Sequence, residues 1–160
     1  MKAPLASGAF FFGASEVDDD ATGATMKIRK EGIAMAKFYE CKKCGNFIGM
    51  VKDVGVVPVC CGAEMSEAVP FSSGQEGAEK HVPLVHEENG KVYVQIGSTL
   101  HPMDSDHYID WVYLLTDQGT QRKVLHPGMK PEVVFLIGEE EVVLSVEAHC
   151  TKHGLWSANV

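Results

Sequence analysis

Four cysteines between residues 41 and 61 place the strongest constraint on what this chain can fold into. They form the pair "CKKC" (Cys41 and Cys44) and the adjacent pair "CC" (Cys60 and Cys61). Two thiolates separated by two residues can bind one metal ion, with backbone amides of the intervening turn facing the sulfurs. The segment around them is too short for a substantial hydrophobic core, so a bound metal would supply much of its folding free energy. The pattern predicts a compact tetrathiolate metal site.

Two alternatives bear on this predicted site. Two disulfides could join the same cysteines, but cytosolic chains rarely keep disulfides, so a metal is the preferred interpretation. The adjacent pair, Cys60 and Cys61, is unusual, because neighbouring thiolates reach one metal only if the sulfur–metal–sulfur angle opens. The spacing alone leaves both zinc and iron open and slightly favours structural zinc.

The composition excludes several classes of function. The chain has 160 residues, 45% of them hydrophobic and 22% charged, which is typical of a globular protein with one ordinary domain or two small ones. Its net charge of −8 argues against binding to nucleic acid or anionic membranes. No segment approaches the roughly 20 apolar residues of a membrane helix. The start "MKAPLASGAFFFGAS" is only weakly similar to a secretory signal, so we expect a cytoplasmic protein whose residues 1–36 form a poorly ordered extension.

Beyond a linker-like segment at residues 71–80, the chain has the patterns of β-structure. In "KVYVQI" Val92, Val94 and Ile96 alternate with their neighbours, as in a half-buried strand, and the preceding "ENG" favours a tight hairpin. The segment "YIDWVYLL" places four residues on one face: Ile109, Trp111, Tyr113 and Leu115. Further short strands are expected in "EVVFLI" and "EVVLSVEA". This spacing predicts a mainly β fold, an antiparallel sandwich or barrel.

The fifth cysteine, Cys150, lies far from the other four and is followed three residues later by His153. Three of the histidines that precede it lie near expected strand ends or loops where side chains can converge: His81, His101 and His107. One thiolate with several imidazoles suits iron, copper or zinc. Spacing leaves open the alternative that these histidines are scattered surface residues. If Cys150 faces a metal, His149 should face away from it, because neighbours on an extended strand point to opposite sides.

Five motifs, taken in order, resemble one known family. The motifs "YECKKCGN…VCCGAEM", "EKHVP", "HPMDSDHYIDW", "LHPGMKPE" and "HCTKHGLW" are together similar to desulfoferrodoxin, the two-iron superoxide reductase. The resemblance implies a desulforedoxin-like metal domain at residues 37–72 and an immunoglobulin-like antiparallel β-sandwich at residues 73–160.

The resemblance also implies two iron ions per chain, in place of the zinc that the spacing favours. The ligands of the first iron would be the clustered thiolates Cys41, Cys44, Cys60 and Cys61. The equatorial ligands of the second, catalytic iron would be the imidazoles of His81, His101, His107 and His153. Cys150 would be its axial thiolate, opposite an open sixth position.

The implied reaction is the one-electron reduction of superoxide, in which superoxide, one electron and two protons give hydrogen peroxide. An axial thiolate donates electron density toward whatever binds opposite it, and backbone amides of residues 151–153 are placed to moderate that donation by hydrogen bonding. The resemblance assigns Lys80 to attract superoxide and help deliver protons, and Glu79 to occupy the sixth position once iron is ferric. Outside this motif, both would be ordinary solvated residues of a linker.

The resemblance further implies a homodimer and a rubredoxin-like electron donor, with no nucleic acid or membrane partner. Three other functions are alternatives: a non-catalytic iron-binding electron-transfer protein, a zinc-ribbon interaction module and a superoxide dismutase. Lys152 in "CTKHG" departs from the apolar residue of many relatives. We expect it to raise the positive potential near the catalytic iron if it points toward that site.

Overall fold

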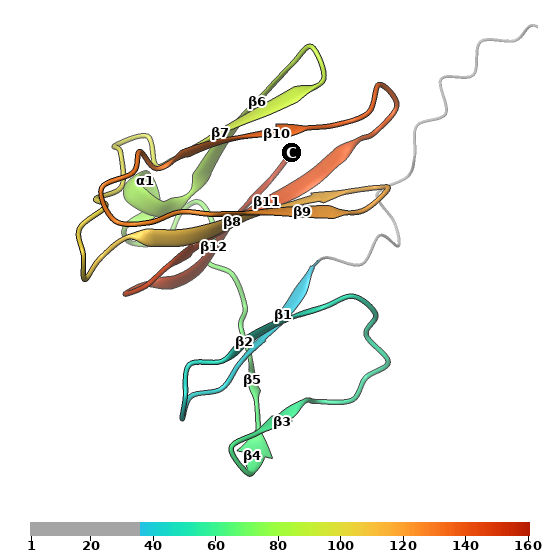
Figure 1. Ribbon diagram of the computed structural model, residues 1–160, viewed down its shortest axis with the longest axis vertical. Helices are drawn as coiled ribbons and strands as arrows, with labels where there is room; N and C mark the ends of the chain where they lie inside the picture. The colour runs from blue at the N-terminus through green and yellow to red at the C-terminus, as the bar shows by residue number, and fades with distance from the viewer. Residues whose placement is uncertain (1–35) are drawn as a thin grey trace, which may run out of the picture. The chain divides into compact units, whose positions relative to one another are not determined.

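The structure consists of a small cysteine-containing unit followed by a β-sandwich (Figure 1). The computed structural model describes residues 36–160, all within the unit Ile33–Val160. The extension predicted for residues 1–36 therefore lies, apart from Ala36, outside the described residues.

The small unit is built from short antiparallel strands. In it β1 (Lys37–Glu40) pairs with β2 (Phe47–Met50) on one side and with β5 (Ser66–Glu67) on the other. A second ladder joins β3 (Val59–Cys60) to β4 (Ala63–Glu64). Its buried cluster is small and includes two of the cysteines: Tyr39, Cys41 and Met65, with Ile48, Met50 and Cys60 packed against them. So little apolar packing agrees with the prediction that a metal stabilises this unit.

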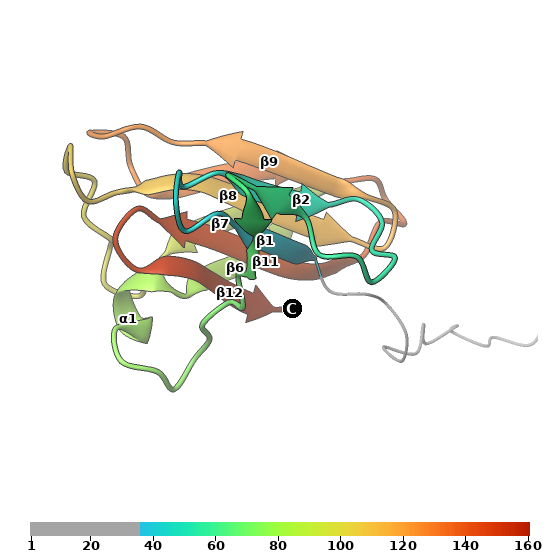
Figure 2. The ribbon, with the colours of Figure 1, turned by 90° about the horizontal axis from the view of Figure 1, so that it is seen from below.

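The rest of the chain forms two antiparallel sheets with a shared core. The first sheet has the strand order β10-β7-β6 and the second has the order β12-β11-β8-β9. Figure 2 shows the second sheet from β12 to β9. The strands of the first sheet are β6 (Pro83–Glu88), β7 (Lys91–Ile96) and β10 (Glu132–Leu136). Those of the second are β8 (Ile109–Thr116), β9 (Thr120–Val124), β11 (Val143–Cys150) and β12 (Gly154–Asn159). The predicted mainly β class and sandwich are confirmed.

The strand and hairpin predicted around residues 88–96 are both present. The three alternating residues of β7, Val92, Val94 and Ile96, are buried in the core between the sheets. The turn from β6 to β7 is made by Asn89 and Gly90, with φ of 51° and 71°. Positive φ at both positions is what a tight type I′ hairpin requires, and Asn-Gly adopts it at low cost.

Among residues 36–160 no helix is long and apolar enough to cross a bilayer.

The face predicted for β8 is only partly correct. Ile109 lies in the core, but it shares that core with Val112 and Leu114 rather than with Trp111 and Tyr113. The pairing of β8 with β11 shifts register between His149 and Cys150, and an irregularity of this kind changes which residues face inward. The rings of Trp111 and Tyr113 instead contact Phe38 of β1, with centroids 5.6 and 5.2 Å apart.

Glu147 on β11 carries a buried carboxyl group and is not one of the apolar residues of the sandwich core. Glu147 is 1% exposed; its Oε1 accepts a hydrogen bond of 2.7 Å from the Ser145 hydroxyl, and its Oε2 has no partner among residues 36–160. Burial without a counter-charge disfavours the ionised form and raises the pKa of Glu147 to about 7.

The protein is therefore expected to lose stability as pH rises from 5 to 8. Because the folded state binds the Glu147 proton more tightly than the unfolded state, the free energy of unfolding falls between the two pKa values, by up to about 3 kcal/mol. Glu147→Gln, which stays neutral and keeps an acceptor for Ser145, should remove most of this slope. Urea unfolding of both proteins at pH 5 and pH 8 measures it, with the exposed Glu139→Gln as control. Equal slopes in the parent and Glu147→Gln would contradict the prediction.

Candidate metal centres

The four clustered cysteines converge in the small unit, and we call them the tetracysteine site: Cys41, Cys44, Cys60 and Cys61. The first two flank a turn closed by hydrogen bonds from Cys41 N to Asn46 O and from Gly45 N to Cys41 O, both 2.8 Å. All four sulfurs lie within 4.8 Å of one another. The Sγ atoms of Cys44 and Cys60 are 3.7 Å apart, and all five cysteines of the chain are free. Such distances suit a shared cation and exceed a disulfide bond of about 2.05 Å.

The adjacent pair reaches the site through an unusual backbone. Cys61 has a φ of 52°, in the left-handed region that few residues other than glycine adopt. In an ordinary extended backbone the side chains of Cys60 and Cys61 would point to opposite sides. The local conformation therefore brings two neighbouring thiols to one point, at a cost that a shared ligand would offset.

Three thiols of this site have pKa values shifted in different directions. Backbone amides of Cys44 and Lys43 donate toward the sulfur of Cys41 and lower the pKa of its thiol to about 7. The nearby thiol of Cys44 raises the pKa of Cys60 and raises that of Cys61 to about 12. Four thiolates so close together repel one another, and a bound cation removes that penalty.

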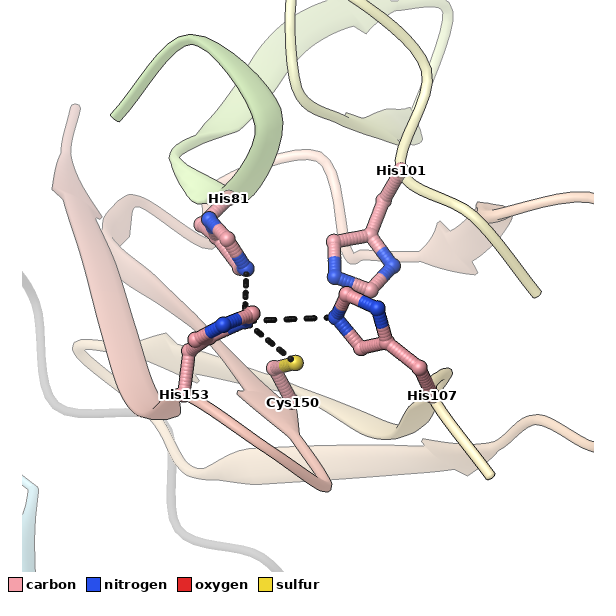
Figure 3. Close-up of side chains that lie close together, drawn as sticks. All are labelled: His81, His101, His107, Cys150 and His153. Carbon is pink, nitrogen blue, oxygen red and sulfur yellow. Dashed lines mark hydrogen bonds between the residues drawn. The ribbon is translucent and has the colours of Figure 1, made fainter. Parts of the chain in front are cut away.

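A second group of ligand atoms gathers at one end of the sandwich (Figure 3). We call it the histidine–cysteine site: His81, His101, His107, Cys150 and His153. His81 ends the short helix α1 (Ala78–His81), two histidines come from the loop that precedes β8, and the last two residues flank the turn between β11 and β12. One ligand atom from each residue lies within 4.8 Å of all the others. The structure thus brings together all five residues proposed from the sequence.

His153 lies close to three other members of the histidine–cysteine site. Its Nδ1 is 2.9 Å from His81 Nε2, 3.2 Å from His107 Nε2 and 3.4 Å from Cys150 Sγ. His81, His101 and Cys150 are buried, whereas His153 is exposed and His107 is half-buried. The site is therefore enclosed on one side and open to solvent on the other.

Two of the imidazoles are oriented by carbonyl groups. His81 Nδ1 lies 2.8 Å from Gly77 O, and His101 Nδ1 lies 2.6 Å from Pro102 O. A carbonyl accepts, so Nδ1 must carry the proton and Nε2 is left with its lone pair directed into the site. The Nε2 of His101 is buried and has no hydrogen-bond partner among residues 36–160. An orphaned imidazole lone pair among three other imidazoles and a thiol fits a metal ion.

The same burial keeps the imidazoles in the form that binds metals. It lowers the pKa of His81 and of His107 and lowers that of His101 to about 4, so these rings are neutral at pH 7. Burial raises the pKa of the Cys150 thiol, while the backbone amides of Lys152 and His153 donate toward its sulfur and act in the opposite direction. Two of the three amides expected to face this sulfur therefore do so.

Glu79 and Lys80 lie on α1, directly before the buried His81, and both side chains are exposed. Their backbone is held by the turn that follows β7: Glu79 O accepts hydrogen bonds from Thr99 N at 2.9 Å and from the Ser98 hydroxyl at 3.1 Å. Gly97 has a φ of 82°, and a Cβ there would lie 2.5 Å from Lys80 O. Glycine is thus required at position 97, because a side chain there would clash with the Lys80 carbonyl. This close approach holds the backbone from which the Glu79 and Lys80 side chains extend.

Lys152 forms an ion pair that the sequence did not reveal. Its Nζ lies 2.8 Å from Asp106 Oδ2, so Asp106 offsets much of the positive potential expected from Lys152. The pair also joins the turn carrying Cys150 to the loop carrying His107. His149, as expected, faces away from the site, where it lies 2.7 Å from Asp110 Oδ1 and stacks on Trp111.

Comparisons with known proteins cover most of the chain. Residues 73–159 match the protein family described as Desulfoferrodoxin. A desulfoferrodoxin homolog from Archaeoglobus fulgidus is 40% identical over 120 residues, which are 75% of this chain and 94% of that protein. A desulfoferrodoxin from Desulfarculus baarsii is 36% identical, with 75% of this chain and 93% of that protein covered. Among solved structures, the superoxide reductase from Treponema pallidum matches with a TM-score of 0.68 and 31% identity, covering 78% of this chain and 98% of that one.

Proposed function

The chain belongs to the desulfoferrodoxin family, and from that premise we propose that its histidine–cysteine site is the active site of a superoxide reductase. The observation that supports this most strongly is the meeting of four imidazoles and one thiol from three separate segments within 4.8 Å. The reaction adds one electron and two protons to superoxide and releases hydrogen peroxide. The two groups of ligands match the two iron sites of the family.

The donor set defines what a bound iron would contribute. His81, His101, His107, His153 and Cys150 would hold a ferrous iron, and that iron would supply the one electron that reduces superoxide. The chain's part is to present neutral imidazoles and to set how strongly the Cys150 sulfur donates. Amides of Lys152 and His153 draw charge from that sulfur, which moderates the donation.

We propose that Lys80 and Glu79 act at the open side of this site. Substrate attraction needs a local positive charge, because a net charge of −8 repels an anion on average. Lys80 is exposed, unlike Lys152 has no carboxylate within ion-pair distance among residues 36–160, and directly precedes a ligand. It attracts superoxide and orders water that delivers protons. Glu79, on the same short helix as His81, would be a further ligand for the oxidised iron.

Lys80→Ala is expected to slow the second-order reaction with superoxide by about 10-fold at low ionic strength and to flatten its dependence on salt. Lys152→Ala is the matched control, and because Asp106 already offsets its charge, we expect less than about a twofold change. Pulse radiolysis at several salt concentrations measures both rates. A larger effect at Lys152 than at Lys80 would reverse the roles proposed for them.

Metal analysis together with an absorption spectrum and a superoxide-reduction assay tests the proposed function as a whole. We expect two irons per chain, two distinct thiolate absorption bands and consumption of superoxide without release of dioxygen. A colourless protein with bound zinc would support an interaction module instead. Two irons without turnover would support an electron-transfer protein, and dioxygen release would support a dismutase.

We also propose a rubredoxin-like donor that docks at the tetracysteine site. Cys44 and Cys61 are exposed there, and Lys42 and Lys43 lie beside them, with Lys43 Nζ 3.1 Å from Cys61 O. Lys43 next to exposed thiolates suits an acidic redox partner, whereas the charge of Lys42 is offset by its ion pair with Glu40. Lys43→Glu should slow reduction by such a donor several-fold at low salt and leave the reaction with superoxide unchanged. An unaltered reduction rate would argue against this docking site.

The assembly proposed for the protein is a homodimer of chains with two domains, residues 37–72 and 73–160. Support comes from exposed apolar side chains in the small unit, Val51, Val54, Val56 and Val59, which a second copy could cover. Sedimentation equilibrium tests the dimer, and separate expression of residues 73–160 tests the boundary.

A cytoplasmic location is proposed because the five free thiols need a reducing compartment, and cell fractionation tests it.

A further inference from the structure

Trp156 of β12 lies between the two ends of the segment that carries the proposed catalytic residues. Its indole stacks on the imidazole of His81, with ring centroids 4.6 Å and planes 15° apart. The ring of Phe71 lies 5.1 Å from the same indole. Trp156 and His81 are each 4% exposed, so their stack lies in the interior, whereas Phe71 is 43% exposed. One side chain therefore contacts the start and the end of residues 71–81.

The backbone reinforces this arrangement at the Phe71 end. Phe71 N donates to Leu155 O and Ser157 N donates to Phe71 O, both at 2.8 Å, so Phe71 pairs with β12 on either side of Trp156. Residues 72–76, by contrast, are exposed, as are Glu79 and Lys80. The exposed residues of the segment, which include Glu79 and Lys80, therefore lie between Phe71 and His81. Both of these end residues contact Trp156.

The stack restricts rotation of the His81 ring together with two other contacts, His153 Nδ1 at 2.9 Å from Nε2 and the His101 ring at a centroid distance of 4.7 Å. The hydrogen bond from His81 Nδ1 to Gly77 O fixes one atom of the ring but leaves rotation about that direction. A flat indole against the imidazole face opposes that rotation, and rotation would turn Nε2 away from the other ligands. Trp156 Nε1 is buried without a partner among residues 36–160, a cost that phenylalanine would avoid.

We propose that Trp156 is a positioning residue, whose indole holds the His81 imidazole in its ligating orientation and anchors the segment bearing Glu79 and Lys80. This inference rests on the proposed function for the roles of those three residues. It predicts that the effect of Trp156 is exerted through the metal-binding geometry of the histidine–cysteine site, and that the tetracysteine site does not depend on it.

The chain offers a matched control in its second tryptophan. Trp111 stacks on His149, with centroids 5.3 Å and planes 5° apart, and His149 is outside the group of ligand atoms. Trp111→Leu therefore removes the same kind of contact from a histidine that binds no metal. Trp156→Phe keeps an aromatic face against His81 and is the conservative variant.

The test measures iron release from the intact, iron-loaded protein under anaerobic conditions, with a chromophoric chelator for ferrous iron. The absorption of the tetracysteine iron is followed separately, so that its share can be subtracted. Trp156→Leu is expected to speed release from the histidine–cysteine site by about 10- to 100-fold. Trp156→Phe and Trp111→Leu should stay within about threefold of the parent. Trp156→Met, which fills much of the volume without a flat face, should behave like Trp156→Leu.

Equal release rates in the parent and in Trp156→Leu or Trp156→Met would overturn the proposal, as would Trp156→Phe releasing iron as fast as Trp156→Leu. If the leucine variant fails to fold, Trp156→Met takes its place in the comparison with Trp156→Phe. Iron release needs no superoxide. A parent protein that holds iron but does not reduce superoxide would refute the proposed function and leave this inference intact.

Discussion

Cys150→Ser is expected to abolish nearly all superoxide reduction while the tetracysteine site keeps its iron. The sulfur of Cys150 is fully buried, 3.4 Å from His153 Nδ1, and is the one soft donor among the five ligands. A serine hydroxyl is smaller, harder and not ionised at neutral pH, so it cannot replace a thiolate that donates electron density. We expect the second-order rate to fall by roughly 100-fold or more. The thiolate absorption of this site should disappear in the same variant.

The measurement is pulse radiolysis combined with iron analysis and a visible spectrum. His149→Gln is the control, since His149 precedes Cys150 yet turns toward Asp110 and Trp111. It should lose less than about threefold in rate, because its ring lies outside the ligand set. A Cys150→Ser protein that keeps the absorption band and half of the activity would show that Cys150 is not the axial ligand.

The fold could be predicted from the sequence where the signal is local. The alternation in β7 and the Asn89-Gly90 turn depend only on neighbouring residues, and both were correct. The face predicted for β8 was correct only for Ile109, because apolar side chains occupy both sides of that strand. Trp111 and Tyr113 contact Phe38 rather than the sandwich core, and a pattern of alternation does not say which partner each face meets.

The two metal centres differ in the same way. The tetracysteine site depends on residues close together in the sequence, and the histidine–cysteine site depends on residues far apart. Spacing alone indicated the tetracysteine site, whereas the residues only suggested the histidine ligands and the resemblance decided for them, because His81 and His153 lie 72 positions apart. The partners of those ligands had no sequence signal. The pairing of Lys152 with Asp106 and the stack of Trp156 on His81 arise only when separate loops meet in space.

Cys41→Ser is expected to unfold the small unit, residues 37–67, while the sandwich stays folded. Two of the six clustered side chains in this unit, Cys41 and Cys60, are also proposed metal ligands. The metal is therefore part of the core. Structural metal sites contribute on the order of 10 kcal/mol to the folding of small domains, far more than so few apolar contacts supply. Loss of one thiolate should remove the iron and with it the order of β1 to β5.

Hydrogen exchange read by mass spectrometry checks this directly, together with iron content. Amides of β1 and β2 should lose protection in Cys41→Ser, those of β7 and β11 should keep it, and iron should fall from two to one per chain. Cys150→Ser serves as the reciprocal control, because it should alter only the histidine–cysteine site. If β1 and β2 remained protected in Cys41→Ser without iron, apolar packing would be enough to fold the unit, and the metal would serve electron transfer rather than stability.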